Sequence, residues 1–320
     1  MKISAVIPVY NGEHTIARAI DSVLAQTRPA DEVIVIDDGS TDQTVKSVQA
    51  YGDTVILIQQ QNAGASVTRN TGIEAATGDW IAFLDGDDEW LPDNLKLQSE
   101  HLAQHPDLEW TTANYYRCDC QQNHTHTADM SPAAIRQCRS VEVADGFFPD
   151  YLAPCAYGAK GHTDTMLIRR DLLMRAGLFL PGQKRMNDID LWYRIAYLQP
   201  RFGFVYEPLA VYHLGVPNSI VKAHTDWHLI EQFLTRHLAL AEQAGKSEQF
   251  RPVARIAMNH WMPILMNEGQ GSGIRRLLQK HGHLMHPGYR RSCYLGSFCP
   301  ALWTKKEKLK RNIRGVDRRG

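Results

Sequence analysis

The fold is decided by the stretch VIVIDDGSTD, residues 33–42, in which four consecutive apolar residues lead directly into two aspartates and a glycine-containing turn. An apolar run without alternation is typical of a strand that is covered on both faces. Similar runs occur at residues 3–9, 55–58 and 80–84. The sequence therefore predicts at least four parallel strands in its first ninety residues.

Segments with helical spacing separate these apolar runs. Ile16, Ile20 and Val23 fall on one stripe of a helix, and Val45 and Val48 fall on a second. Strands that alternate with helices form right-handed βαβ units. We predict an α/β fold in which a Rossmann-like, mostly parallel sheet is sandwiched by helices.

The rest of the chain divides by composition. We expect a helix after Pro92 and a strand over 110–116, then a surface excursion over 117–160, where periodicity is lost. A strand over 163–168, a helix from Asp188 to Pro200 and two short strands follow. After Ser219 the pattern is helical only, with one stripe through Val253, Ile256, His260, Trp261 and Ile264. We predict a catalytic domain over 1–220, a helical C-terminal region over 221–302 and a basic tail over 303–320.

The charge distribution limits the partners of the chain. Lys plus Arg and Asp plus Glu both total 35, but residues 305–320 hold eight basic and two acidic residues. A nucleic-acid-binding protein would carry its basic excess on the folded body, so we expect no nucleic acid partner. The tail suits an anionic membrane surface, as in a peripheral protein on the inner face of the plasma membrane; a solvated tail explains the same composition.

Cysteine content and hydropathy point to the cytoplasm. The six cysteines are few for 320 residues and lie outside the first third of the chain, which does not suit a disulfide framework. We therefore expect reduced thiols. The apolar run near the N-terminus is too short for a signal peptide, and no run approaches membrane-spanning length.

Acidic residues gather where the apolar runs stop. Asp37 and Asp38 follow the second run, and Asp85, Asp87 and Asp88 follow the fourth. In an open parallel sheet these strand ends form one edge, where ligands bind. Carboxylates packed together repel one another, and a divalent cation relieves this repulsion. Oxygen ligands and a diphosphate substrate favour Mg²⁺ or Mn²⁺.

Four ordered motifs carry a family resemblance. They are IPVYN at 7–11, VIDDGSTD at 35–42, NAG at 62–64 followed by RN at 69–70, and FLDGDD at 83–88. With these motifs the first 220 residues resemble the family 2 glycosyltransferases, which have the nucleotide-diphospho-sugar transferase fold of GT-A type. The resemblance implies an inverting enzyme that moves a sugar from a metal-bound nucleoside-diphosphate sugar, with a UDP-sugar expected, onto a glycan or lipid-linked acceptor in cell-surface polysaccharide or glycolipid synthesis.

The resemblance also implies roles for residues of this sequence. The predicted metal ligands are Asp85 and Asp87, with Asp85 also meeting ribose or sugar. The nucleotide-sugar site is predicted to comprise Pro8, Tyr10, Asn11, Glu13, Asp38, Asn62, Gly64, Arg69, Asp85, Gly86 and Asp87.

The predicted general base lies in NDIDLW, residues 187–192, at the start of a helix. This stretch resembles the family's Glu-Asp-x-Asp-Leu-Trp, which places Asp188 in the base position and Asn187 where the family has Glu. A base is needed because the acceptor hydroxyl must lose its proton as the bond forms. Asp188 could instead cap the helix, and capping is the favoured role for Asp190.

Several alternatives stay open. Single aspartates at strand ends also serve as turn and cap residues, and Arg69 could be a structural ion pair. The family's metal-approaching His aligns with Gly215, and His213 beside it suits a packing role. Cys118, Cys120, His124 and His126 offer zinc-ligand chemistry at uncommon spacing. A nucleotidyltransferase or a non-catalytic sugar-nucleotide-binding relative is the competing function, although the glycine-rich phosphate loop of the former is missing after the first strand.

Overall fold

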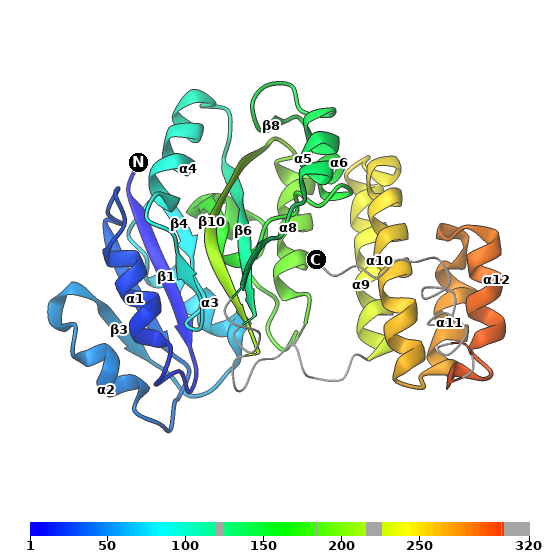
Figure 1. The fold of residues 1–320 in the computed structure, drawn as a ribbon, viewed down its shortest axis with the longest axis horizontal. Coiled ribbons are helices and arrows are strands. Elements are labelled where there is room, and N and C mark those ends of the chain that lie inside the picture. The colour runs from blue at the N-terminus through cyan, green and yellow to red at the C-terminus, as the bar shows by residue number, and fades with distance from the viewer. Residues whose placement is uncertain (120–124, 184, 216–225, 302, 304–320) are drawn as a thin grey trace. The chain divides into compact units, whose positions relative to one another are not determined.

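The chain forms two compact units, Met1–Ser219 and Ile220–Gly320 (Figure 1). A computed structural model describes all residues except 120–124, 184, 216–225, 302 and 304–320. All of the predicted basic tail except Trp303, and half of the predicted Cys/His group, therefore lie outside the described residues. The two units are described separately below.

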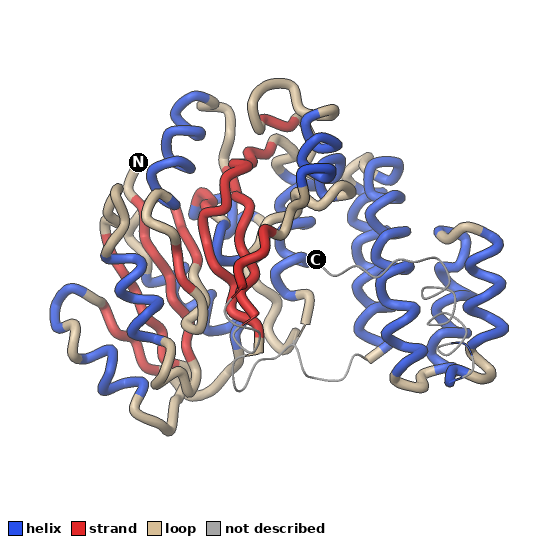
Figure 2. Tube along the Cα trace, viewed as in Figure 1, coloured by secondary structure: helices blue, strands red, loops and turns tan. Residues whose placement is uncertain are grey.

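The described residues of the first unit form a ten-stranded sheet. Its parallel part has the order β3-β2-β1-β4, with helices between successive strands in the sequence (Figure 2). These strands are β1 (Ile3–Val9), β2 (Glu32–Asp37), β3 (Ile56–Gln59) and β4 (Trp80–Phe83). The four predicted parallel strands are confirmed.

Helices cover both faces of this part of the sheet. Neighbouring residues of β1 point to opposite faces, so each set of side chains packs against a different helix. Ile7 and its same-face neighbours share a core cluster with the buried stripe of α1 (Ile16–Leu24). Val6, on the other face, lies against α3 (Ala65–Ala75), whose Gly72 has no room for a side chain beside it. Burial on both faces explains why the strand sequences are apolar without alternation.

The sheet continues beyond β4 in mixed directions, in the order β4-β9-β6-β10-β5. Among the described residues, β9 and β5 run opposite to the other six strands of the main path, so the sheet is mostly parallel as predicted. The added strands are β5 (Glu89–Trp90), β6 (Trp110–Asp119), β9 (Leu167–Arg169) and β10 (Phe202–Leu214). Two short strands, β7 (Thr125–Ala128) and β8 (Phe147–Phe148), pair with β6 and β10.

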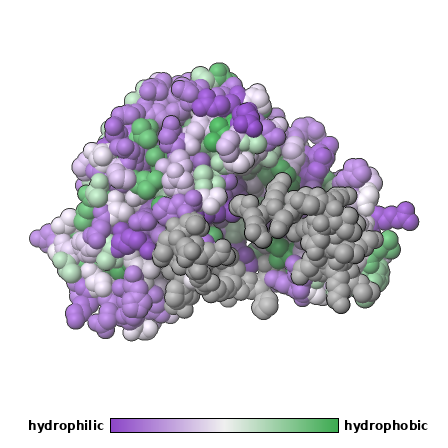
Figure 3. Space-filling model, in the orientation of Figure 1, coloured by the Kyte–Doolittle hydropathy of each residue, from purple (hydrophilic) through white to green (hydrophobic). Residues whose placement is uncertain are grey.

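The remaining helices of the first unit connect or cover these strands. They are α2 (Thr44–Gln49), α4 (Asn94–Gln104), α5 (Pro132–Arg139), α6 (Leu152–Cys155), α7 (Arg170–Arg175) and α8 (Asn187–Leu198). On the face seen in Figure 3, hydrophilic residues cover most of the surface and hydrophobic ones are scattered. This distribution is normal for a folded domain whose core is closed.

Three sequence predictions for the first unit were wrong in detail. The predicted surface excursion contains α5, α6 and β8, and buries Phe148 and Tyr151 against Phe202. The predicted strand over 163–168 is a 3-10 turn followed by the short β9. The two predicted strands near Pro208 are one strand, β10, whose register shifts on either side of that proline. Isolated aromatic residues and a bulge leave no periodic signal for prediction.

The second unit contains only helices among its described residues. These are α9 (Trp227–Gln243), α10 (Ser247–Asn267), α11 (Gly271–His281), the 3-10 turn η4 (Gly282–Leu284) and α12 (Pro287–Gly296). Of the predicted α10 stripe only Val253 is buried; Ile256 is 46% exposed, whereas Met258 and Met262, outside the stripe, are buried. Methionine fills irregular gaps between helices, so it takes the core positions here. No described helix has the length and apolar character needed to cross a membrane.

Candidate functional site

The loops that follow β1 and β2 are tied together by hydrogen bonds. The backbone N–H of Thr41 donates to Oδ1 of Asn11 at 2.8 Å, and that of Gln43 donates to Oε2 of Glu13 at 3.0 Å. Asn11 has a positive φ of 50°, which an asparagine tolerates in a turn. Tyr10 is 49% exposed and Pro8 partly buried at the same place. Asn11 and Glu13 thus fix the shape of this edge, while Tyr10 presents a free ring.

Asp38 organises the next loop. It is buried, and its two carboxylate oxygens accept hydrogen bonds from the backbone N–H groups of Ala63 (2.9 Å) and Gly64 (2.8 Å) and from Nε2 of Gln60 (2.7 Å). Asn62 lies exposed within the loop that Asp38 holds. The predicted nucleotide-site residues Asp38, Asn62 and Gly64 are therefore brought together at one strand end.

The DGDD turn after β4 packs against the end of β1. Gly86 lies so close that a Cβ there would come within 3.1 Å of the carbonyl oxygen of Pro8 and of Val9. A side chain at this position would push the turn away from β1. The guanidinium of Arg18 donates to the carbonyl oxygen of Asp87 and holds the far side of the turn. The turn is thus set firmly at the carboxyl edge of the parallel strands.

Three carboxylates meet at this turn. One oxygen of each of Asp85, Asp88 and Asp164 lies within 4.8 Å of the others, and Asp88 and Asp164 are buried. Oδ1 of Asp164 accepts the backbone N–H of Asp85 at 2.8 Å, and Oδ1 of Asp88 accepts that of His213 at 2.7 Å. These two contacts with the backbone anchor the cluster.

Oδ2 of Asp88 is buried without a hydrogen-bond donor among the described residues. The carboxylate of Asp164 lies close by, and the two side chains could share a proton. Burial and the negative charges of Asp164, Asp87 and Asp85 raise the pKa of Asp88 well above its usual range. Buried carboxylates are stable when they are paired or bind a metal, so the cluster suits a divalent cation. The residues present therefore fit the metal that the sequence predicts.

Two cationic side chains border the cluster. Arg69, buried, contacts Oδ1 of Asp85 at 2.6 Å, and its guanidinium lies 5.4 Å from the centre of the Phe179 ring. Nδ1 of His162 lies 2.7 Å from Oδ2 of Asp164. Burial opposes the charged form of His162, but the carboxylates of Asp164, Asp85 and Asp188 outweigh it and raise the pKa of His162 to about 8. These cations offset part of the negative charge.

Asp87 lies beside the three-carboxylate cluster and is partly exposed. Burial, followed by the charges of Asp85 and Asp164, raises the pKa of Asp87 to about 6. The predicted metal pair was Asp85 and Asp87, whereas the oxygens that the structure groups most tightly belong to Asp85, Asp88 and Asp164. Asp87 remains a predicted ligand at the rim of this group.

Asp188 faces the same region from α8. It is partly buried in the first turn of the helix, after Met186 in a left-handed conformation with φ of 56°. Asp188 is near enough to Arg69 and His162 for its charge to help raise the pKa of each, after the larger effects of burial and the closer carboxylates. The amide of Asn187 donates to Oγ of Ser66 at 3.2 Å and fixes the start of the helix.

Asp190 has a different role. It is fully buried and forms an ion pair with Arg194 at 2.8 Å, while Arg194 also donates to the carbonyl oxygens of Ala176 and Leu178. This pair joins α8 to the end of α7. His213 also has a structural partner, because its Nε2 lies 3.0 Å from Oε1 of Glu89.

His162 and Asp164 were not among the predicted site residues. The predicted ones follow strands, but β9 runs antiparallel to β4, so the residues before β9 lie at the carboxyl end of β4. His162 stands directly before the predicted strand over 163–168 and Asp164 lies inside it, so a charged residue within an otherwise apolar strand prediction was the available signal. Tyr115 and Tyr212, whose ring centres lie 4.9 and 4.6 Å from that of His162, complete this part of the site.

Known proteins resemble the chain in sequence. An uncharacterized glycosyltransferase of Rickettsia prowazekii is 30% identical over 192 residues, which span 60% of this chain and 58% of that protein. YibD, an uncharacterized glycosyltransferase of Escherichia coli, is 47% identical over 94 residues, 28% of this chain and 27% of its own length. UDP-Glc:alpha-D-GlcNAc-diphosphoundecaprenol beta-1,3-glucosyltransferase WfgD of Escherichia coli is 38% identical over 115 residues, 35% of this chain and 45% of that protein. The matches thus cover less than two thirds of each relative.

Solved structures resemble the chain in fold. Residues 1–349 of S. aureus TarS, crystallised in complex with UDP-GlcNAc, give a TM-score of 0.68 at 18% identity and cover 98% of this chain and 92% of that one. This likeness confirms the predicted GT-A type α/β fold with a helical C-terminal region. The sequence profile of the family described as glycosyl transferase family 2 matches residues 4–173, and the chain belongs to that family.

Proposed function

We propose that this protein is an inverting glycosyltransferase that transfers a sugar from a nucleoside-diphosphate sugar to an acceptor hydroxyl. The observation that carries the proposal is the convergence of Asp85, Asp88 and Asp164 at the carboxyl edge of the sheet, with Asp188 facing the same region. Membership of glycosyl transferase family 2 supports it.

The donor is proposed to be a UDP-sugar. TarS was crystallised with UDP-GlcNAc and with UDP, and WfgD is named for its use of UDP-Glc. In this chain the half-exposed ring of Tyr10 and the loop held by Asp38 form the proposed walls of the nucleotide pocket. Aromatic rings with one free face suit stacking on a base.

The diphosphate is proposed to bind beside the carboxylate cluster through Mg²⁺ or Mn²⁺. Asp85, Asp88 and Asp164 would hold the cation, with Asp87 at the rim. When bound, the cation neutralises the negative charge that develops on the departing diphosphate. Arg69 contacts Asp85 and His162 contacts Asp164, and these contacts keep two of the proposed ligand carboxylates in place.

The general base is proposed to be Asp188. Inversion requires the acceptor hydroxyl to attack from the side opposite the leaving diphosphate, with a carboxylate to take its proton. Asn187, tied to Ser66, leaves Asp188 without the neighbouring acid that the family motif has. Asp190 is committed to Arg194 and stays structural.

The acceptor is proposed to be a glycan or a lipid-linked sugar used in polysaccharide or glycolipid synthesis. WfgD, by its name, acts on a diphosphoundecaprenol-linked sugar. We propose that the chain works in the cytoplasm at the inner face of the plasma membrane, with its basic C-terminal tail against anionic lipid. The evidence for the tail is its sequence, with eight basic and two acidic residues over 305–320.

A donor panel tests the proposed chemistry. Wild type and Asp188→Asn would be incubated with UDP-sugars, Mn²⁺ and a lipid-linked sugar acceptor, and UDP release and donor binding would both be measured. We expect Asp188→Asn to lose about 10³-fold in kcat, within the range for a general base, and to bind donor as wild type does. Asp171→Asn, an exposed aspartate on α7, is the matched control. Donor binding without turnover by wild type would favour a non-catalytic relative.

A further inference from the structure

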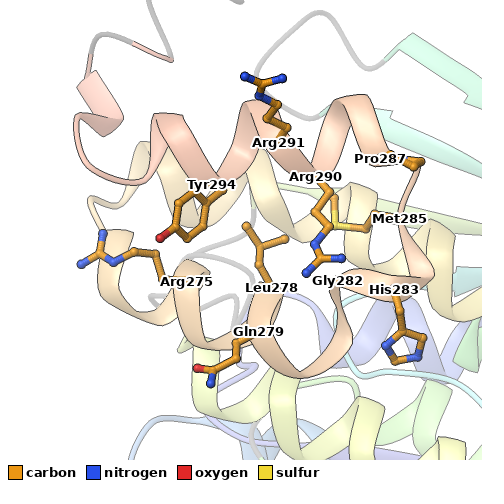
Figure 4. A pocket seen from close by; sticks show the side chains of 10 residues that line it. All are labelled: Arg275, Leu278, Gln279, Gly282, His283, Met285, Pro287, Arg290, Arg291 and Tyr294. Atoms are coloured by element: carbon orange, nitrogen blue, oxygen red, sulfur yellow. The ribbon is translucent and has the colours of Figure 1, made fainter.

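The second unit contains a pocket that the sugar-transfer chemistry does not use. It lies between α11, η4 and α12 and has a volume of about 700 Å³, within the range of small-molecule sites (Figure 4). Basic residues on its lining include Arg275 and Arg290, and apolar ones include Leu278, Met285 and Tyr294. The lining formed by the described chain includes no Asp or Glu.

The segment of sequence that forms this pocket carries charge of one sign. From Gly269 to Trp303 the sequence contains five Lys or Arg residues and no Asp or Glu. The guanidinium of Arg290 has no ion-pair or hydrogen-bond partner among the described residues, and Figure 4 shows it reaching from α12 towards Gly282. Guanidinium groups left unpaired in a concave site favour an anionic ligand, above all a phosphate.

Two contacts position these cations. Nη1 of Arg275 donates to the carbonyl oxygen of Ser297 at 3.0 Å, and its guanidinium lies 4.6 Å from the centre of the Phe298 ring. Gly282 leaves space for Arg290, because a Cβ there would lie 2.7 Å from Nε of Arg290. A glycine at this point lets the Arg290 side chain lie across η4. The pocket therefore places positively charged side chains next to the apolar residues of its lining.

Exposed aromatic side chains lie at one end of the pocket. Tyr294, which lines it, is 47% exposed, and Phe298, whose ring centre lies 5.4 Å from that of Tyr294, is 62% exposed. Exposed apolar groups beside a basic pocket match a ligand that has a phosphate at one end and a hydrocarbon chain at the other. A free phosphate would use the arginines and leave the apolar side chains without a role.

We propose that the pocket between α11 and α12 binds the phosphate group of a lipid, with Arg290 on the phosphate and Tyr294 and Phe298 along the first part of the hydrocarbon chain. The proposed contacts include no residue of the basic tail and none of the residues proposed for sugar transfer. It gives the helical unit its own means of holding an anionic lipid.

Calorimetric titration of the full chain tests this site. The probes are dodecyl phosphate below its micelle concentration, inorganic phosphate as the headgroup alone, and dodecyl maltoside as an uncharged amphiphile. We expect only dodecyl phosphate to bind measurably. We expect Arg290→Gln to weaken it about tenfold, as for the loss of one charged hydrogen-bond donor, and Arg290→Lys to restore part of the affinity.

Two further variants complete the test. Arg251→Gln removes an exposed arginine of α10 whose partner is Glu248, and it should bind as wild type does. Tyr294→Ser should weaken dodecyl phosphate because it removes part of the apolar wall. Equal binding of dodecyl maltoside or of inorganic phosphate would overturn the proposal, and so would wild-type affinity in a folded Arg290→Gln variant, with folding checked by circular dichroism.

Discussion

Two buried aspartates in the first unit have opposite surroundings. Asp190 is fully buried and paired with Arg194, which is itself held by two backbone carbonyl oxygens. Asp88 is equally buried, but one of its oxygens has no donor among the described residues and its neighbours are other carboxylates. Burial of a carboxylate therefore does not by itself mark a functional site. The absence, among the described residues, of a counter-charge beside the buried carboxylate distinguishes the candidate site of Asp88 from the structural pair of Asp190.

The largest expected effect on stability is at the paired aspartate. Asp190→Asn leaves the guanidinium of Arg194 buried without its counter-ion, and breaking a buried pair costs about 3 kcal/mol. We expect the free energy of unfolding to fall by this amount in urea titrations, whether or not Mn²⁺ is present. Asp171→Asn on the surface serves as the control. A loss below 1 kcal/mol would remove the distinction between the two aspartates.

A pH effect of intermediate size tests the same comparison on a buried histidine. His101 of α4 is buried, and its Nε2 has no hydrogen-bond partner among the described residues. Burial, and then the neighbouring His105, lower the pKa of His101 to about 4. In the unfolded chain the pKa of His101 is higher, so the unfolded state binds a proton at a pH where the folded state does not. The free energy of unfolding therefore decreases as the pH falls from about 6.5 towards 4.

The measurement is urea unfolding of wild type and His101→Phe at pH 7 and pH 5. His101 should account for about 2 kcal/mol of the wild type's loss between these values, and His101→Phe should lose that much less. His105→Phe, next to it in space, is the comparison variant. Equal losses in wild type and His101→Phe would show that His101 takes up its proton without opposing folding.

The smallest expected change in stability is at the unpaired aspartate. Asp88→Asn keeps an oxygen for the backbone N–H of His213 and gains an amide that can donate to Asp164. Without metal, the free energy of unfolding should stay the same or rise by up to about 1 kcal/mol, because like-charge repulsion is removed. A loss as large as that of Asp190→Asn would show that the carboxylate of Asp88 stabilises the fold.

Much of the fold could be predicted from the sequence because its main strands carry strong signals. The runs that became β1, β2 and β4 are continuous, apolar and followed by glycine-containing turns, which fixes both their type and their edge. The predicted stripe of α10 was mostly wrong because Met258 and Met262 occupy the buried positions of the helix, whereas Ile256, which the hydrophobic pattern favoured, is exposed. Residues of the segment between β8 and α6, such as Tyr151, are buried by packing that no local pattern records.

The candidate site was predicted in part for a related reason. Asp85, Asp87 and Asp188 stand in recognisable motifs, whereas Asp164 and His162 precede a strand whose direction the local sequence does not reveal. An antiparallel strand brings the residues before it to the edge where parallel strands end. The antiparallel direction of β9 relative to β4 therefore explains why Asp164 and His162 lie beside Asp85.

Mn²⁺ binding is the most direct test of the carboxylate cluster. Electron paramagnetic resonance would measure free Mn²⁺ in titrations of wild type and Asp164→Asn, with UDP present and with Asp171→Asn as the control. We predict that wild type and Asp171→Asn bind one Mn²⁺ with equal affinity and that Asp164→Asn binds it about tenfold or more weakly. Wild-type affinity in a folded Asp164→Asn variant would contradict the assignment of the cluster as the cation site.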